Sequence, residues 1–557
     1  TAGMITGYYY GNQRGFTTVI AEEVKATGRY RSQAKAEWYR RAVRQGGGEV
    51  WFGSMVVGAV VEGKRLRGLV VATPDGQRGV VLAKAVIDAT GNADVAAAAG
   101  EETVFYQPDE LIGQGVGMAV IRLGAGGHNN DFSFVDDTDA SDLSFFGLRT
   151  RQMTEAGWDV SQLVNSRERR RLVGVYQMTA LDFLTARTFP DTIIQHRSRF
   201  DLHGWASGDF FWTKNIRTTN HVTLEANAPY RALLPKTLDG LLVVGIGMSA
   251  DRDAMSILRM QADLQNQGYA AAYAVYLALK EDCELRDIPV KTLQQHLVES
   301  GVVPECVLTD ADSYPIHDSL LKLASHHVMF GYEGLPLLFA DPERAKPYLQ
   351  EKYTELSTHS SGRDPEVSLV YAHILAVLGD PVGEDELIAW VQANSWDAKW
   401  KEGLGAGGSR MDAYLLALGR AKSKKAVPVI AEKIRELAVA GKTPQAAAHC
   451  RIVALVSQML GDPLLAEPLA ALLDAPDVAG HAIRLGPEIP PVPGYDSRSS
   501  YSQKEKGDVT REINLAAALY RLGDKDGKGE AILKSYAEDP RGFCANYARR
   551  VLAERAQ

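Results

Sequence analysis

An apolar stretch that runs into a glycine-rich turn offers the first chemistry in this sequence. Leu241–Val244 lead directly into GIGMSA at 245–250, and a long helix of small residues is expected to follow. Glycine lets a backbone approach a ligand closely, and the N-terminus of a helix offers unpaired N–H groups to negatively charged or electron-rich groups. We therefore predict that the turn contacts a ligand through Gly245, Gly247, Ser249 and Ala250.

A second strand ends in a similar way. Residues 85–89, AVIDA, form a largely apolar run of the kind found in buried parallel sheets, and they lead into Thr90-Gly91 and a short helix at 92–99. In open α/β sheets, ligands bind beyond the carboxyl ends of the strands. Thr90 and Gly91 are therefore predicted to contact a ligand as well.

Polar residues interrupt the helix that follows residue 250. Gln265, Asn266, Gln267 and Gly268 fall within it, and buried amides require hydrogen-bond partners. A ligand or a neighbouring loop would serve equally as that partner. Arg252 is expected to begin the helix, where a fixed cation could stabilise negative charge on a ligand or pair with the adjacent aspartates.

Histidines and aromatic residues gather in residues 196–221. A histidine titrates near neutral pH and can accept a proton from a substrate hydroxyl, so His203 and His221 are candidate bases, with a structural role as the alternative for each. Arg197 could bind a carboxylate or sugar hydroxyls. The other members of the group could equally be core residues: His196, Trp205, Phe210, Phe211 and Trp212.

The spacing around Gly245 does not fit the opening turn of a dinucleotide-binding fold. Such a turn requires a second strand that ends in Asp or Glu about 20 residues later, to bind a ribose hydroxyl. Asp263 lies near that offset, but it falls inside the expected helix, and the sequence after Lys280 contains no apolar strand. We interpret the turn as closing an α/β domain rather than opening one.

The composition is that of an ordinary globular protein with several domains. The chain has 557 residues, of which 45% are hydrophobic and 23% charged, and its formal net charge is −8, which argues against a general nucleic-acid-binding protein. The sequence contains no run of about 18 uncharged apolar residues, so no membrane span is predicted. The four cysteines form no CxxC or Cys/His cluster, so no metal site is expected. The sequence does not decide whether two of them form a disulfide, or in which compartment the protein functions.

Hydrophobic periodicity predicts different elements in the two halves. In the first half, a helix at 30–46 is followed by a meander of about four strands over 49–89, and a further helix is expected at 165–186. From about residue 360 the sequence is helical, and LGDP at 378–381 and 460–463 has related turns at 418–420 and 522–524. A period of about 40 residues is typical of HEAT-like helix pairs; an ordinary helical bundle is the alternative.

Two segments in combination resemble the FAD-dependent oxidoreductases with a flavin fold of the glutathione-reductase type. Residues 83–100, AKAVIDATGNADVAAAAG, are similar to the ATG strand and turn of that family. Residues 229–275, from PYRALLPK to QNQGYAAAYAV, are similar to the C-terminal flavin-binding segment of one bacterial branch. The resemblance covers roughly residues 1–285.

The resemblance implies FAD as the cofactor and gives the candidate residues more specific places. Gly245, Gly247, Ser249 and Ala250 would lie near the ribityl–phosphate chain, and the 265–268 amides near the ring edge. The backbone of Val57 would contact the adenine end, and Arg252 would face the reduced flavin. The implied fold class is an α/β flavin-binding domain of Rossmann type that is incomplete at its N-terminus, with an inserted α+β substrate domain and an all-α repeat domain.

The family opens with a GxGxxG turn that this sequence does not contain. We therefore expect a companion N-terminal polypeptide to carry that motif and complete the sheet, as the other product of a cleavage before Thr1 or as a separate chain. The expected domains are a partial FAD-binding domain at 1–125 that includes a three-stranded β-meander at 49–84, a substrate domain at 126–228, the rest of the FAD-binding domain at 229–285, a helical linker at 286–360 and a repeat domain at 361–557.

The function implied is oxidation or reduction of a small organic substrate, sugar-like or an organic acid, by hydride transfer at flavin N5. The helical repeats would mediate assembly, and a homo-oligomer is conceivable. One alternative is a non-catalytic, flavoprotein-like scaffold that presents the repeats to a partner. A second alternative is hydrolysis by Thr1 acting as nucleophile and base, but residues 1–60 lack the pattern of that fold.

Overall fold

The computed structural model divides the chain into two compact units. The first unit comprises residues 1–105, 161–201 and 220–314, and the second comprises residues 106–160, 202–219 and 315–557. The residues that the structure describes are 13–27, 31–118, 120–122, 125–128, 133–154, 157–160, 167, 169–214, 223–358, 365–396, 408–440, 446–486, 504–524 and 526–554.

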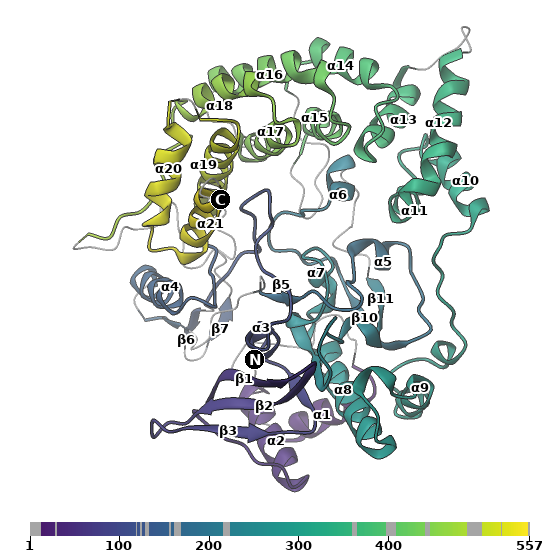
Figure 1. The fold of residues 1–557 in the computed structure, drawn as a ribbon, viewed down its shortest axis with the longest axis vertical. Helices are drawn as coiled ribbons and strands as arrows, with labels where there is room; N and C mark the ends of the chain where they lie inside the picture. Colours follow the sequence, from purple (N-terminus) through teal and green to yellow (C-terminus); the bar gives the residue numbers. More distant parts are fainter. Residues whose placement is uncertain are drawn as a thin grey trace. The chain divides into compact units, whose positions relative to one another are not determined.

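The first unit mixes strands and helices (Figure 1). Its strands are β1 (Met55–Glu62), β2 (Arg65–Ala72), β3 (Arg78–Leu82), β4 (Val86–Asp88), β5 (Thr103–Val104), β9 (Arg171–Leu172), β10 (Thr192–Ser198), β11 (Leu224–Pro229) and β12 (Leu241–Val243). Its α-helices are α1 (Phe16–Ala26), α2 (Arg31–Gln45), α3 (Asp94–Ala98), α5 (Ala180–Leu184), α7 (Met255–Leu258), α8 (Gln261–Glu281) and α9 (Val290–Glu299).

Two sheets of the first unit frame the predicted ligand edge. Strands β1, β2 and β3 form an antiparallel sheet in that order, while β4 leaves it and pairs in parallel with β12. Residues 49–84 therefore form a three-stranded meander, as expected from the resemblance, and the fourth strand of this region, Val86–Asp88, belongs to the parallel pair instead. The apolar core beneath β4 and β12 includes Leu66, Val86, Val95, Leu172 and Val243.

The helix predicted at 165–186 is wrong for the residues that the structure describes. Arg171–Leu172 form strand β9, which pairs with β5, and only Ala180–Leu184 are helical. Tertiary packing explains the difference, since Gly174 lies so close to its neighbours that a Cβ there would be 2.6 Å from the carbonyl oxygen of Leu234. Helical propensity is a weak preference that such packing overrides.

The second unit is mostly helical. It contains the short strands β6 (Val120–Arg122), β7 (Ala125–His128) and β8 (Asp159–Val160), which form one antiparallel sheet. Its α-helices are α4 (Ala140–Met153), α6 (Asp209–Thr213), α10 (Asp318–His327), α11 (Leu335–Ala340), α12 (Pro342–Thr358), α13 (Pro365–Val377), α14 (Glu384–Ala393), α15 (Arg410–Arg420), α16 (Val427–Ala440), α17 (Ala446–Leu460), α18 (Ala466–Leu473), α19 (Lys504–Arg521), α20 (Lys528–Ala537) and α21 (Gly542–Ala553).

Helices α13 to α20 pack as successive pairs (Figure 1). Helices α13, α15, α17 and α19 contact one another in order, and α14, α16 and α18 form a second row. The LGDP turns at 378–381 and 460–463 join the two helices of a pair. The assignment of these pairs to the HEAT class stays a prediction.

Buried ion pairs tie the segment 106–160 to these helices within the second unit. Arg451 pairs with Glu110 through two hydrogen bonds, one of them 2.6 Å long, and the two side chains are 0% and 6% exposed. Arg149 makes two 2.9 Å bonds to Glu505, which also accepts from Arg541. Burial alone would raise the pKa of Glu505, but Arg541 and Arg149 together hold that pKa below its ordinary value.

The described residues contain neither a membrane-spanning helix nor a cluster of metal ligands. None of the helices described is both long and apolar enough to cross a membrane. Within the same residues, no group of three or more His, Cys, Asp or Glu side chains is arranged to hold a metal ion. The four cysteines, all described, form no disulfide.

Replacing Arg451 by Met should lower the free energy of unfolding of the second unit by about 3–5 kcal/mol, because Glu110 would keep a buried and unpaired charge. The matched control is Arg435→Met, which breaks an exposed pair with Glu467 and should cost about 1 kcal/mol or less. Urea unfolding followed by tryptophan fluorescence measures both.

Replacing the two partners together, as Arg451→Met with Glu110→Leu, should recover much of that loss. If Arg451→Met unfolds at the same urea concentration as the wild type, the buried pair does not stabilise this unit.

Candidate functional site

The parallel pairing of β4 and β12 brings two glycine turns to one edge of the first unit. Val86 pairs with Leu241, Ile87 with Leu242 and Asp88 with Val243. Because parallel strands end at the same edge of a sheet, residues 90–93 after β4 and residues 245–248 after β12 leave that edge together. We call these two segments the joined turns.

The joined turns approach each other more closely than side chains would allow. A Cβ at Gly247 would lie 2.9 Å from the backbone nitrogen of Ala93, so a larger residue would force the turns apart. Gly91 and Gly245 have φ values of +81° and +73°, which favour glycine. A Cβ at Gly245 would meet no described atom within 4 Å, so this side of the backbone is open.

Asp88, which sequence reasoning missed, holds the first of the joined turns in shape. Its buried carboxylate accepts hydrogen bonds from the Thr90 hydroxyl at 2.7 Å, the Thr90 N–H at 3.0 Å and the N–H groups of Val95 and Ala96. The Thr90 hydroxyl also accepts from the Asp94 N–H at 3.0 Å. The side chain of Thr90 therefore helps to hold the turn in shape. The sequence signal that could have identified Asp88 is an aspartate at the end of a predicted strand.

Each amide of α8 has a hydrogen-bond partner within the chain, but the buried side-chain oxygens of Gln265 and Asn266 have none among the described residues. Gln267 accepts a 2.6 Å hydrogen bond from the Gly245 N–H and donates to the sulfur of Met248, so it fixes the second turn. Gln265 donates to the Tyr39 hydroxyl, and Asn266 donates to the carbonyl oxygen of Arg14. The sequence left open whether a ligand or a neighbouring segment would bind these amides, and the hydrogen bonds described here are to neighbouring segments. Gly268 lies on the same helix, with open space beside its Cα.

Ser249 and Ala250 lie beneath the second turn, in contact with the segment 169–174. Ser249 is buried and its hydroxyl oxygen accepts from the Gly174 N–H at 3.0 Å. The carbonyl oxygen of Ala250 accepts from Arg171 Nε at 3.2 Å. These contacts support the turn from below, and a ligand role for the two residues stays a prediction.

Arg252 does not begin a helix, contrary to expectation. Residues 252–254 form a turn, and the helical run is broken into α7 and α8 between Leu258 and Gln261. Arg252 is buried, with Nη1 3.5 Å from the carboxylate of Asp253. Burial, with added repulsion from Asp253, raises the pKa of the neighbouring Asp251 to about 7.

The other predicted residues belong to other segments than the joined turns, or they lie outside the described residues. His203 belongs to the second unit, where its backbone has a φ of +50°, and His221 lies outside the described residues. Arg197 lies on β10, half-exposed and 3.5 Å from Glu225. Val57 lies on β1 with its side chain half-exposed. Roles for these residues stay predictions.

The structure adds Asn92 and the arginine-rich segment 169–171 to the candidate residues. Asn92 is buried beside Gly91, and its side-chain oxygen has no hydrogen-bond partner among the described residues. Arg170 Nε donates to the carbonyl oxygen of Asn92 at 2.9 Å, and Arg170 Nη2 lies 2.5 Å from Asp94. Sequence reasoning placed the arginines on a helix and so gave them no role at this edge.

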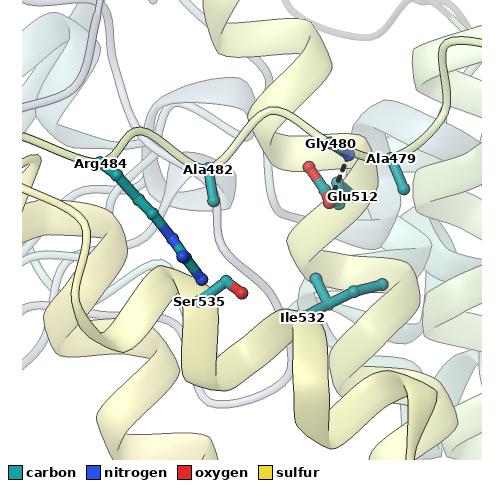
Figure 2. A pocket seen from close by; sticks show the side chains of 7 residues that line it. All are labelled: Ala479, Gly480, Ala482, Arg484, Glu512, Ile532 and Ser535. Atoms are coloured by element: carbon teal, nitrogen blue, oxygen red, sulfur yellow. Dashed lines mark hydrogen bonds between the residues drawn. The ribbon is translucent and has the colours of Figure 1, made fainter. Parts of the chain in front are cut away.

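A separate hollow of about 480 Å³ lies in the second unit, between α19, α20 and residues 479–484 (Figure 2). Its one carboxylate, Glu512, already accepts hydrogen bonds from the N–H groups of Gly480 and His481 and from the Tyr536 hydroxyl. Arg484 is the other charged residue of the lining. The hollow therefore offers fewer groups that could bind a ligand than the joined turns do.

The first unit should lose stability as the pH rises from about 4 to about 7. Asp251 has its ordinary pKa of 3.8 when unfolded and a pKa of about 7 when folded, so the folded state holds the proton more tightly and loses that advantage as the proton leaves. Asp251→Asn should flatten this part of the pH profile, whereas Asp287→Asn, at an exposed site, should not. Thermal unfolding across this range measures the effect; an unchanged slope in Asp251→Asn would refute the raised pKa.

Comparison with known proteins agrees with the geometry of the first unit. The family model described as FAD dependent oxidoreductase matches residues 10–141 and 145–297, about half of the chain. No curated protein matches significantly, and no solved structure does so either. The matched residues include β4, β12, the joined turns and α8. The chain therefore belongs to the FAD-dependent oxidoreductase family.

Proposed function

We propose that FAD, the cofactor of this family, binds across the joined turns of the first unit. Three features fit such a ligand. Gly247 and Ala93 bring two backbones together without side chains between them, Gly245 leaves open space at the edge, and the buried oxygen of Asn92 has no hydrogen-bond partner in the described part of the chain. Gly91, Asn92, Gly245 and Gly247 would then hold the cofactor through backbone and amide groups.

The reaction that fits the cofactor is oxidation or reduction of a small organic substrate. Bound FAD would supply a hydride acceptor or donor at N5, which the protein must place against the reacting substrate carbon. An alcohol or amine substrate also needs a base for its proton, and we propose His203 or His221 for that role. Arg197, half-exposed on β10, would bind a carboxylate or hydroxyl group of a sugar-like or organic-acid substrate.

Arg252 is proposed to act electrostatically rather than by contact with substrate. It is 1% exposed and lies beside Asp253, in the segment that follows the second of the joined turns. A buried cation at this position would favour negative charge on the reduced cofactor.

The helical pairs of the second unit favour a scaffold as the second candidate function. HEAT-like arrays present a concave face to partners, and the proposal for α13 to α20 is that they mediate assembly. A scaffold would retain the fold without turnover, so reduction of bound flavin by an organic substrate separates the two functions.

Purified protein should bind FAD and show flavin absorbance that a chemical reductant bleaches. Gly247→Ala should lower FAD affinity by at least about tenfold, because the added Cβ forces the joined turns apart. Gly147→Ala is the matched control, since a Cβ there meets no described atom within 4 Å. A colourless wild-type protein that does not take up FAD, or equal affinity in the two variants, would contradict the proposed site.

We further propose that an additional polypeptide segment covers β1 and the outer edge of β4. Trp51 and Phe52, just before β1, and Met55, its first residue, are more than half exposed. Among the described strands, β4 pairs only with β12, so its other edge is open to a further strand. Clustered exposed apolar side chains mark interaction sites, and a strand–GxGxxG–helix segment would supply the missing phosphate contacts.

Native mass spectrometry of the purified protein should find this segment. A separate companion would add its mass to that of the 557 residues without covalent linkage, and an upstream part of the same chain would add it covalently. Replacing Trp51, Phe52 and Met55 by serine should release a separate companion, or expose a linked segment to protease, while Val439→Ser, at an exposed site of the second unit, should not. A bare chain, or a homodimer of bare chains, would contradict this proposal.

A further inference from the structure

The arginine-rich segment at 169–171 crosses the carboxyl ends of β4 and β12. Arg170 contacts the first of the joined turns through the carbonyl oxygen of Asn92, as described above. Arg171 is buried and donates to the carbonyl oxygen of Ala250, just after the second turn. Two neighbouring arginines thus fasten this segment to both turns.

The side chain of Arg169 lies where the two turns meet. A Cβ built on Gly91 would be 3.6 Å from Arg169 Nη1 and 3.7 Å from Cγ1 of Ile246, which belongs to the second turn. The guanidinium group therefore lies against the bare side of Gly91, close to Ile246. These distances are those of ordinary van der Waals contact, so the Arg169 side chain packs directly against the backbone of Gly91.

The backbone of Arg169 is itself held in position. Arg171 Nη1 donates to the carbonyl oxygen of Arg169 at 2.8 Å, and Arg170 is bound to Asn92 and Asp94. Arg169 is only partly buried, unlike Arg171. Arg170 and Arg171 thus hold the turns, and the side chain of Arg169 lies at the edge that they form.

We propose that Arg169 binds the diphosphate of FAD at the joined turns. A guanidinium group is planar, permanently charged and able to donate two parallel hydrogen bonds to phosphate oxygens. The glycine turns bring the backbone close enough for a diphosphate to lie between them and the arginine. This assignment rests on binding of FAD at the joined turns, and it concerns the anionic part of the cofactor rather than the reacting ring.

The test compares Arg169→Met with the wild type for binding of FAD, ADP and riboflavin, followed by fluorescence and calorimetry. Loss of a charged hydrogen-bonding partner should weaken FAD and ADP binding by about 10- to 100-fold, reduce the salt dependence of that binding, and leave riboflavin binding unchanged. Arg169→Lys should recover part of the affinity, because the charge is kept without the paired donors.

The matched control is Arg286→Met. Arg286 belongs to the same unit and contacts Asp239 and the carbonyl oxygen of Leu238, which precede β12 at its amino end. That end is opposite the joined turns, so this variant should bind FAD and ADP as the wild type does.

Three results would overturn the assignment. If Arg169→Met binds ADP and FAD with unchanged affinity, Arg169 does not bind the diphosphate. If the variant shifts the midpoint potential of bound FAD while ADP affinity is unchanged, the arginine faces the ring instead. If wild-type protein binds neither FAD nor ADP, the proposed cofactor site falls together with this assignment.

Discussion

The close approach of Gly247 to the backbone of Ala93 is the constraint on which the edge formed by the joined turns depends. The two residues follow strands that are far apart in sequence and adjacent in the parallel pair of β4 and β12. Asp88 fixes the first turn from within, and Gln267 fixes the second from α8. Because each turn is held by buried side chains of its own unit, the edge is organised before any ligand arrives, which is the condition for efficient binding.

Buried polar side chains have different partners in the two units. In the first unit, buried polar side chains such as Asp88, Gln267 and Arg171 hold backbone groups of the turns. In the second unit, Glu110 and Glu505 are buried against arginines, which joins the segment 106–160 to the helical pairs. Buried charges of this kind demand their partners, so the segment and the helices fold as one body.

The sequence was sufficient to predict β4, β12, the turns that follow them and the family, because these are local patterns. AVIDATG and LLVVGIG each combine an apolar run with glycines, and their pairing follows from the parallel sheet. It was not sufficient for the segment 165–186, where a charged run resembled a helix but its described part is fastened across the turns by Arg170 and Arg171. It also gave no sign that Gln267 would hold Gly245, since such contacts depend on tertiary packing rather than on spacing.

A structure of the protein with FAD bound tests the central claim most directly. The account predicts diphosphate oxygens within hydrogen-bonding distance of the joined turns, at residues 90–93 and 245–248, with the cofactor lying over the bare backbone of Gly245. Electron density for FAD elsewhere in the chain, with the edge of β4 and β12 closed by side chains, would contradict it.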